Sequence, residues 1–473
     1  MEKQAINDYV RSLDYLIGEA LNVVSEDNPQ ALPDRTKNDK GVIICTNRKK
    51  EVTIDAQEIS ILSPANGVIF PGALILGNSA LAAGKPTAIT LGRAPIKLRV
   101  DLPDYNGVIQ VKDPKNSTVE LAIDKTVSEW HKTVGANGQD IVARMSKEIK
   151  KADSTSQLAI DLGFNIKWAS NEVRNQLKYE KNTSKTTAVA FFKQVYYTVT
   201  VDLPSDPAAV FAESVTLKDV EKVAYVTRDQ SNPSKTKINP PAYVKSVDYG
   251  RIIMMRMDTS HSHSKTDVEN ALKIVTTGGK EINADSKTKM EEIINNSSIT
   301  VLVLGGGAKI ASEAFEPNSF DKIPEIIKKG ATLNKENPAF PISYTVNFLK
   351  DHQLAVMKMS TNYIETECIA YPAGFIELVN GSGCITNFKV TWDEVGDDGK
   401  KVERSFNSGD KNNGYKHRIY LQGDTTNIRI IGKAAVFIKT WKEVLNVVEY
   451  GPTNSTYAIR GSIGKLRKDI TTN

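Results

Sequence analysis

Apolar residues recur along this chain at two spacings, and each spacing predicts a different kind of element. Between Ile6 and Leu21 they follow one another every three or four residues, which predicts a helix over 6–24. Further helices are expected over 118–132, 140–151, 208–213, 217–223, 268–275, 287–295 and 320–329. Strands are expected over 96–101, 188–202, 244–257, 299–304, 374–379, 387–393, 417–421 and 427–431.

The order of these elements favours one fold class. Strands and helices are mixed without the regular rhythm of a parallel sheet, which predicts an α+β fold. A hairpin is expected near the N-terminus, because the apolar run 41–45 and the alternating run 52–56 flank the turn-like 47–50. From Tyr363 onward the pattern is almost entirely strands and turns, with 441–449 left open, so this region predicts a separate β-sandwich.

The most informative pattern is an alternation of large apolar residues with small or polar ones, closed by a tryptophan. Its apolar positions are Leu158, Ile160, Leu162, Phe164, Ile166 and Trp168. A half-buried strand of a soluble sheet alternates in this way. So does a membrane-spanning β-strand, which needs about 9–11 residues, one lipid-facing side and an aromatic residue at the interface.

Two neighbouring stretches favour the membrane interpretation. The polar, lysine-rich stretch 171–185 follows the alternation and precedes the long strand expected at 188–202. A second polar stretch, 258–298, suits either an alternating strand or one face of a helix. Such ambiguity is typical of a segment that changes from a helix to a membrane hairpin, because the two packings differ little in free energy.

A run of three glycines follows the strand expected at 299–304. Because glycine tolerates positive φ, Gly305, Gly306 and Gly307 predict a hinge or a break in strand pairing. Their spacing matches neither the dinucleotide-binding motif nor the P-loop, which argues against a phosphate-binding loop.

Composition narrows the function classes. The 473 residues suggest three or four domains, and 40% hydrophobic with 25% charged residues is typical of a soluble globular protein. A net charge of +5, without basic residues interleaved with aromatic ones, predicts no nucleic-acid partner. No run of about 18 apolar residues occurs, so a membrane would have to be crossed by a β-barrel. The opening residues, MEKQAIND, contain no signal-peptide core.

Cysteine and histidine offer little candidate chemistry. Three cysteines exclude a disulfide-dense framework; Cys368 and Cys384 could pair, but buried free thiols, Cys45 included, are the favoured interpretation. His261 and His263 have no carboxylate or cysteine at metal-ligand spacing, and no catalytic motif occurs. We therefore expect neither an enzyme nor a metal or cofactor.

Short motifs follow one another in an order that covers nearly the whole chain. They are EISI (58–61), FPGAL (70–74), KP (85–86), DLP (101–103), EWH (129–131), KQVYYTV (193–199), LPSDPAAVF (203–211), YGR (249–251), LGG (304–306), NPAFPISYT (337–345) and VTWDE (390–394). In these motifs and their spacing the chain resembles the thiol-activated, or cholesterol-dependent, cytolysins.

The resemblance implies an elongated fold of four domains, with a central twisted antiparallel sheet flanked by helical bundles. Domain 1 would comprise 1–25, 62–152, 201–258 and 325–345, domain 2 would comprise 26–61 and 346–362, domain 3 would comprise 153–200 and 259–324, and domain 4, the C-terminal β-sandwich, would comprise 363–473.

The resemblance also implies a secreted pore-forming toxin. A soluble monomer would bind a target membrane and close into a ring with other copies. The segments 154–185 and 259–297 would then become transmembrane hairpins of one large β-barrel. Gly305 and Gly306 match the family hinge, where an edge strand swings away so that monomers can pair.

The loops that contact sterol in relatives are changed here. Relatives carry an eleven-residue loop rich in tryptophan and containing a cysteine, whereas this chain has the shorter stretch 432–440 and then a single tryptophan, Trp441. Ile463 and Gly464 stand where relatives have a sterol-reading Thr-Leu pair. Thiol activation should therefore be absent.

Several residues of these loops still suit contact with a membrane or receptor. The candidates are Lys433, Val436, Phe437, Ile438, Lys439, Trp441, Ile463 and Gly464. Their apolar side chains suit insertion into a bilayer, and their lysines suit anionic headgroups or a carboxylated glycan. The partners left open are a sterol, an anionic lipid, a glycan, a protein receptor and a second cytolysin-like subunit. The alternative function is a non-lytic binding protein on the same scaffold.

Overall fold

The computed structural model describes residues 1–472 except 26–29, 39–40, 64–66, 106, 139, 181–184, 230–235, 260–263, 279–289, 292, 306–311, 316, 336, 397–398 and 438–439. These residues form two compact units. The N-terminal unit comprises Met1–Gln30 and Arg48–Glu365, and the C-terminal unit comprises Ala31–Asn47 and Thr366–Asn473. The finer division into four domains stays a prediction.

The N-terminal unit is built on a ten-stranded antiparallel sheet whose longest pairing joins β9 (Thr186–Val201) to β12 (Pro241–Thr259). The sheet order is β14-β13-β12-β9-β6-β7, and β4, β5, β8 and β15 pair at its sides. The other bounds are β4 Ile59–Ser60, β5 Leu74–Leu76, β6 Ile96–Val100, β7 Val108–Val111, β8 Arg144–Lys151, β13 Ser297–Leu304, β14 Ser312–Phe315 and β15 Phe340–Phe348.

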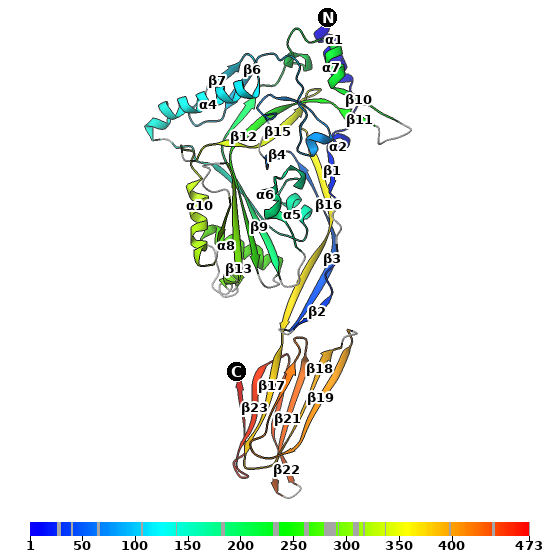
Figure 1. Ribbon diagram of the computed structural model, residues 1–473, viewed down its shortest axis with the longest axis vertical. Helices are drawn as coiled ribbons and strands as arrows, with labels where there is room; N and C mark the ends of the chain where they lie inside the picture. Colours follow the sequence, from blue (N-terminus) through cyan, green and yellow to red (C-terminus); the bar gives the residue numbers. More distant parts are fainter. Residues whose placement is uncertain are drawn as a thin grey trace. The chain divides into compact units, whose positions relative to one another are not determined.

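Each face of this sheet is covered by short helices (Figure 1). Because successive side chains of a strand point to opposite faces, Val189 and Phe191 of β9 join one core, whereas Ala188, Ala190 and Phe192 join another. The first core includes α5 (Thr155–Asp161) and α6 (Asn171–Leu177). The second includes α8 (Lys265–Thr277) and α10 (Ile323–Lys329).

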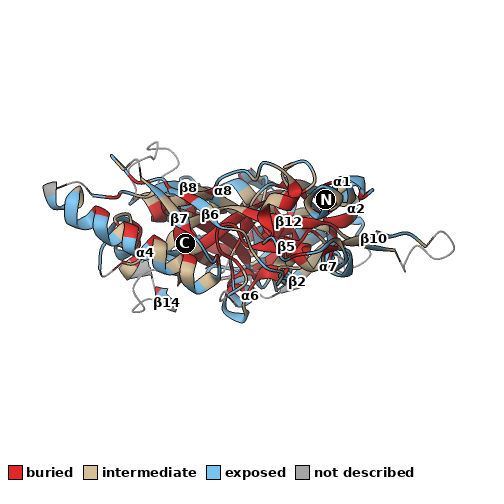
Figure 2. Ribbon diagram, turned by 90° about the horizontal axis from the view of Figure 1, so that it is seen from above, coloured by how far each residue is buried: buried red, intermediate tan, exposed pale blue. Residues whose placement is uncertain are grey.

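Smaller elements complete the N-terminal unit. They are α1 Glu2–Ser12, α2 Ile17–Ala20, β1 Asn22–Ser25, α3 Ser79–Ala82, α4 Asn116–Thr133, α7 Leu217–Val223, β10 Tyr225–Thr227, β11 Lys237–Asn239 and the 3₁₀ turns Gly135–Asn137, Ile166–Trp168, Pro207–Val210 and Pro317–Lys322. Figure 2 shows buried residues on the strands of the sheet and exposed residues along α4. That helix is anchored by Trp130, whose indole Nε1 donates to the carbonyl of Pro103 at 2.6 Å.

The C-terminal unit contains two four-stranded sheets, β20-β17-β23-β24 and β19-β18-β21-β22. Their strands are β17 Gly374–Ser382, β18 Thr386–Val395, β19 Lys401–Lys411, β20 Lys416–Leu421, β21 Thr426–Phe437, β22 Thr440–Glu449, β23 Asn454–Gly461 and β24 Arg467–Thr472. Inward residues of both sheets, among them Leu378, Phe388, Ile430 and Tyr457, form one core. The predicted α+β fold with a C-terminal β-sandwich is confirmed, and 441–449 is a strand.

Four local predictions are wrong. The expected helix over 208–213 is only the 3₁₀ turn Pro207–Val210, after which Phe211 is extended. The expected helix over 6–24 is divided into α1 and α2, and β1 then pairs in parallel with β16 (Met357–Pro372). The expected helix over 140–151 is β8, because its residues pair with β9, which overrides local spacing. The expected hairpin over 41–56 is one 16-residue strand, β3 (Gly41–Ala56), since 47–50 contain neither glycine nor proline to reverse the chain. The helix expected at 287–295 lies partly outside the described residues.

Three of the motifs that carry the family resemblance, EISI, KQVYYTV and YGR, lie together at a bend in the sheet. The β9–β12 register shifts between Tyr249 and Gly250. A Cβ atom on Gly250 would lie 1.9 Å from the carbonyl oxygen of Gln194. Nearby, the Lys193 ammonium pairs with Glu58 at 2.9 Å, and Arg251 Nε donates to Gln194.

We expect Gly250→Ala to lower the free energy of unfolding of the N-terminal unit by about 1–3 kcal/mol, because the added methyl group forces the two central strands apart. Urea denaturation measures this change. Gly18→Ala is the matched control, because a Cβ there meets nothing within 4 Å. Equal stability of both variants and the parent protein would show that the bend tolerates a side chain.

Candidate functional site

The alternating segment is not a strand in this structure. Its first part forms α5, and its last part forms the 3₁₀ turn Ile166–Trp168. Ser154 begins α5: its hydroxyl accepts from the Gln157 amide at 3.0 Å, and Gln157 Oε1 accepts from the Ser154 amide at 3.2 Å. Gly163, at φ +87°, then turns the chain. Because two different turns follow one another, residues two apart are not held on one face.

The six apolar side chains of this segment nevertheless share one environment, the core on one face of the sheet. Leu158, Ile160, Leu162, Phe164 and Trp168 are buried, and Ile166 is partly buried against the same core. Trp168 donates from Nε1 to the carbonyl of Ala82 at 2.9 Å. Phe164 packs on Phe191 of β9, with ring centroids 5.3 Å apart. The segment is therefore packed against the sheet with its apolar side chains shielded from water.

Buried charges attach the same segment to the sheet. Lys151, at the end of β8, pairs with Asp153 at 2.8 Å, and their side chains are only 6% and 3% exposed. The Lys151 amide also donates to Glu269 of α8 at 2.9 Å. At the far end of α6, the Arg256 guanidinium donates to the carbonyl of Gln176 at 3.2 Å. Motif spacing could not reveal the contacts of Lys151 with Glu269 and of Arg256 with Gln176, because these partners lie far apart in the sequence.

The second ambiguous segment is also helical in part. Ser264 begins α8 by accepting from the Asp267 amide, and Gly278 ends it in the left-handed conformation. Val268, Ala271, Leu272 and Val275 lie on its buried face, which confirms the expected helix at 268–275. His261 and His263 lie outside the described residues.

The expected hinge lies at the end of β13. Gly305 has φ +83°, and a Cβ on it would lie 3.0 Å from the carbonyl oxygen of Gly250. The edge strand β14 pairs antiparallel with β13. Ile299 lies opposite Phe315 at one end of this pairing, and Leu302 lies opposite Ser312 at the other. Gly306 lies outside the described residues. A glycine is required at Gly305 both by φ and by the close approach of β12.

A buried cluster of charges supports the sheet near the bend. Asp248 accepts from the hydroxyls of Thr198 at 2.6 Å and Ser343 at 3.1 Å. Burial raises the pKa of Asp248, whereas for Glu58 the ammonium of Lys193 and several hydrogen bonds outweigh burial and lower the pKa. The cluster joins three of the family motifs and leaves Asp248 the more easily protonated carboxylate.

In the C-terminal unit the predicted loop residues gather at one end of the sandwich. Phe437 and Trp441, at the facing ends of β21 and β22, are 74% and 38% exposed. Ile463 is 53% exposed, and Gly464 next to it is also exposed, with nothing within 4 Å of an added Cβ. Val436 is half-buried. Ile438 and Lys439 lie outside the described residues.

Backbone hydrogen bonds show that these loops share one end. The Ala435 amide donates to the carbonyl of Ile385 at 2.9 Å, and the Gly383 amide donates to that of Gly461 at 2.9 Å. Ile385 is itself exposed and adds an apolar residue that sequence analysis missed. We call the exposed residues Ile385, Phe437, Trp441 and Ile463 the apolar tip. Lys433, Lys442 and Lys465 are exposed on the same loops and strands.

The interpretation of the cysteines is wrong for two of the three. Cys45 of β3 and Cys368 of β16 form a disulfide, with their Cα atoms 4.1 Å apart. Cys384 is a buried free thiol. The pair was missed because 323 residues separate its members in the sequence.

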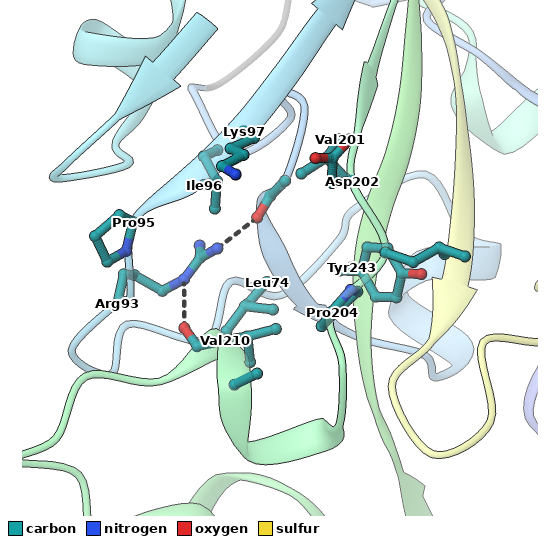
Figure 3. Close-up of a pocket in the computed structure, with 13 residues that line it drawn as sticks. Leu74, Arg93, Pro95, Ile96, Lys97, Val201, Asp202, Pro204, Val210 and Tyr243 are labelled. Carbon is teal, nitrogen blue, oxygen red and sulfur yellow. Dashed lines mark hydrogen bonds between the residues drawn. The ribbon is translucent and has the colours of Figure 1, made fainter. Parts of the chain in front are cut away.

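A pocket of about 320 Å³ lies in the N-terminal unit, lined by residues such as Leu74, Ile96 and Pro204 (Figure 3). Arg93 projects into its wall and donates to the carbonyls of Gly72 at 2.7 Å and Val210 at 3.4 Å. Burial lowers the pKa of Arg93 to about 10. Because the guanidinium bridges two main-chain segments, it holds loops together.

Among the described residues no helix is both long and apolar enough to span a membrane.

Comparison with known proteins gives consistent matches over the whole chain. Residues 5–371 match the family model described as thiol-activated cytolysin, and residues 375–464 match its beta sandwich domain. The chain is 31% identical over 465 residues to perfringolysin O of Clostridium perfringens, which covers 96% of this chain and 90% of that protein.

Two solved structures extend this likeness to the fold. The crystal structure of listeriolysin O is similar at a TM-score of 0.85, with 28% identity over 100% of this chain and 96% of that one. A disulfide-locked mutant of intermedilysin with human CD59 is similar at 0.74, with 25% identity over 100% and 99%.

Sheet, helices and sandwich together define a cytolysin, a class of pore-forming toxins rather than enzymes. The chain belongs to the thiol-activated cytolysin family. The predicted pore-forming function is thereby confirmed, and the non-lytic alternative is not favoured.

Removal of the buried carboxylate at the start of the stored segment should loosen it. We expect Asp153→Ala to lower the free energy of unfolding by about 3–5 kcal/mol, because the Lys151 ammonium stays buried without this carboxylate. Urea denaturation and hydrogen exchange of 154–177 measure the change.

The exposed pair of Lys178 and Glu180 is the matched control, and Glu180→Ala should leave stability unchanged. The double variant Lys151→Met with Asp153→Leu should recover most of the loss, since it removes both charges. No difference between Asp153→Ala and Glu180→Ala would contradict this role.

Proposed function

We propose that this cytolysin inserts the segments 154–185 and 259–297 as membrane hairpins and attaches to the membrane through the apolar tip, without the sterol contacts of its relatives. Copies of the chain close into a ring on the target membrane, and their hairpins join into one β-barrel. The observation that carries this proposal is the conformation of Leu158–Trp168. The segment has the alternating pattern of a strand, but in the described structure it forms a helix and a 3₁₀ turn.

The energetic argument concerns what the alternation does in each state. In the described structure all six apolar side chains pack into one core, although the backbone is helix and turn. In an extended backbone the same six would lie on one face, and the residues between them on the other. That arrangement suits a strand between lipid and a water-filled lumen.

The release of this segment must overcome a few specific contacts. They are the capping of α5 by Ser154, the buried Lys151–Asp153 pair and the hydrogen bond of Trp168 to Ala82. Helices of seven residues, such as α5 and α6, are unstable alone, so loss of the sheet contacts unfolds them. Gly305 supplies the hinge at which the edge of the sheet opens.

The tip favours attachment to an anionic surface. Phe437, Trp441 and Ile463 present exposed apolar side chains, and Lys442 and Lys465 add exposed positive charge. Lysines near a surface of anionic lipid contribute about 1 kcal/mol each. No cysteine occurs between 432 and 441, so thiol activation through this loop is not expected.

A covalent tie between the segment and the N-terminal unit should abolish pores. The Ser170 amide donates to the carbonyl of Leu62 at 2.8 Å, so Leu62→Cys with Ser170→Cys places two thiols on adjacent backbones. We expect the oxidised double variant to bind vesicles as the parent protein does. Its dye release should be lower by about tenfold, because the tied segment cannot leave the sheet. Each single-cysteine variant is a control, because it carries one substitution but cannot form the cross-link. The comparison therefore needs no reductant. Full dye release by the cross-linked protein would refute insertion of this segment.

The tip can be tested with one aromatic at each end of the sandwich. We expect Phe437→Ala to weaken binding to anionic, sterol-free vesicles roughly ten- to a hundredfold, as for the loss of one buried phenyl ring. Tyr420→Ala is the control, because Tyr420 is 76% exposed but pairs with Phe375 at the other end of β17. Binding that requires cholesterol, or equal effects of both variants, would contradict the proposed tip.

A further inference from the structure

The disulfide lies where a distant part of the chain joins the C-terminal unit. Ala31–Asn47 belongs to this unit although the rest of it begins at Thr366. Within the segment, β2 (Arg35–Asn38) pairs with the first residues of β3. Cys45 of β3 is then linked to Cys368 of β16. A short two-stranded hairpin is only marginally stable alone, so its order depends on what holds it.

The hairpin is held noncovalently by β16, which pairs with β3 in a four-stranded sheet of order β1-β16-β3-β2, and by specific side-chain contacts. Arg35 pairs with Asp424 and donates to the carbonyls of Val395 at 3.0 Å and Gly396 at 3.3 Å. Asn47 accepts from the Thr366 hydroxyl at 3.0 Å. To bring these strands together, the chain must close a loop of 323 residues, which costs conformational entropy. The disulfide lowers this cost because it already restricts the unfolded chain. The disulfide therefore adds a covalent link between two strands that also pair in the sheet.

We propose that the Cys45–Cys368 disulfide is a redox latch that keeps the toxin active when oxidised and switches it off when a thiol reduces it. The loss of activity rests on the proposed function, because the C-terminal unit carries the apolar tip. Reduction removes the covalent link between β3 and β16, leaves Ala31–Asn47 held by strand pairing and side-chain contacts alone, and so destabilises that unit. The sign is opposite to thiol activation, in which reduction restores activity.

The reaction is an ordinary thiol–disulfide exchange with a low-molecular-weight thiol. Cys45 is 4% exposed and Cys368 is half-buried, so the thiolate attacks the sulfur of Cys368. The electron pair of the broken S–S bond goes to Cys45, which takes up a proton. A second thiol then attacks the mixed disulfide, giving the oxidised reductant and the protonated thiol of Cys368. Two electrons and two protons are transferred in all.

The test compares the full-length protein with and without dithiothreitol, and with Cys45→Ser/Cys368→Ser. We expect reduction and the double variant to speed hydrogen exchange in 31–47 and to lower the thermal midpoint of the C-terminal unit by on the order of 10 °C. Dye release should fall by about tenfold, because the unit that binds the membrane is destabilised. Dithiothreitol should not change the double variant further.

Cys384→Ala is the matched control, since it removes the third cysteine and keeps the disulfide. It should respond to reductant as the parent protein does. If the double variant does not fold, parent protein that is reduced while folded and then alkylated replaces it. Unchanged exchange and thermal midpoint after complete reduction would overturn the latch, and unchanged dye release would overturn its role as a switch. If no state releases dye, the proposed function fails, while exchange and thermal unfolding still decide the latch.

Discussion

The pairing of β9 with β12 is the constraint on which the N-terminal unit depends. Both strands carry apolar side chains on both faces, with Phe191 and Met254 on one and Phe192 and Met255 on the other. Neither face can be left to water, so each needs a cover of amphipathic segments. The cover on one face is α5 and α6, and on the other it is α8 and α10. The candidate membrane segments thus supply α5, α6 and α8 of this cover, which explains why they must be apolar on one side and polar on the other.

This double use explains which parts of the fold could be predicted from the sequence. Long elements with one strong period, such as α4, β9 and the sandwich strands β17, β18, β20 and β21, were predicted in type and approximate position. Elements decided by a distant partner were not. β8 has a pattern that suits a helix but pairs with β9, and β3 continues through charged residues as one strand. The disulfide could not be predicted, because its cysteines meet only in the folded chain.

The candidate site shows the same limit at the level of single residues. The alternation from Leu158 to Trp168 identified the apolar side chains but not their conformation in the described structure. One local signal was available: Ser154 and Gln157 have the spacing of a capping box, which predicts a helix start. The apolar tip was largely predictable from exposed loop residues, whereas Ile385 comes from a turn distant in sequence. The burial of Lys151 with Asp153 required the fold.

The separation of the two cores has a consequence for the order of events. The core beneath α5 and α6 is continuous with the rest of the N-terminal unit, whereas the core beneath α8 and α10 is a smaller, separate cluster. Regions with their own cores can open as separate cooperative units with different free energies. The α8 face and the α5 face can therefore open independently of each other. Two hairpins of one barrel would then begin as two local unfolding reactions with different barriers, and the slower of them would set the pace of pore formation.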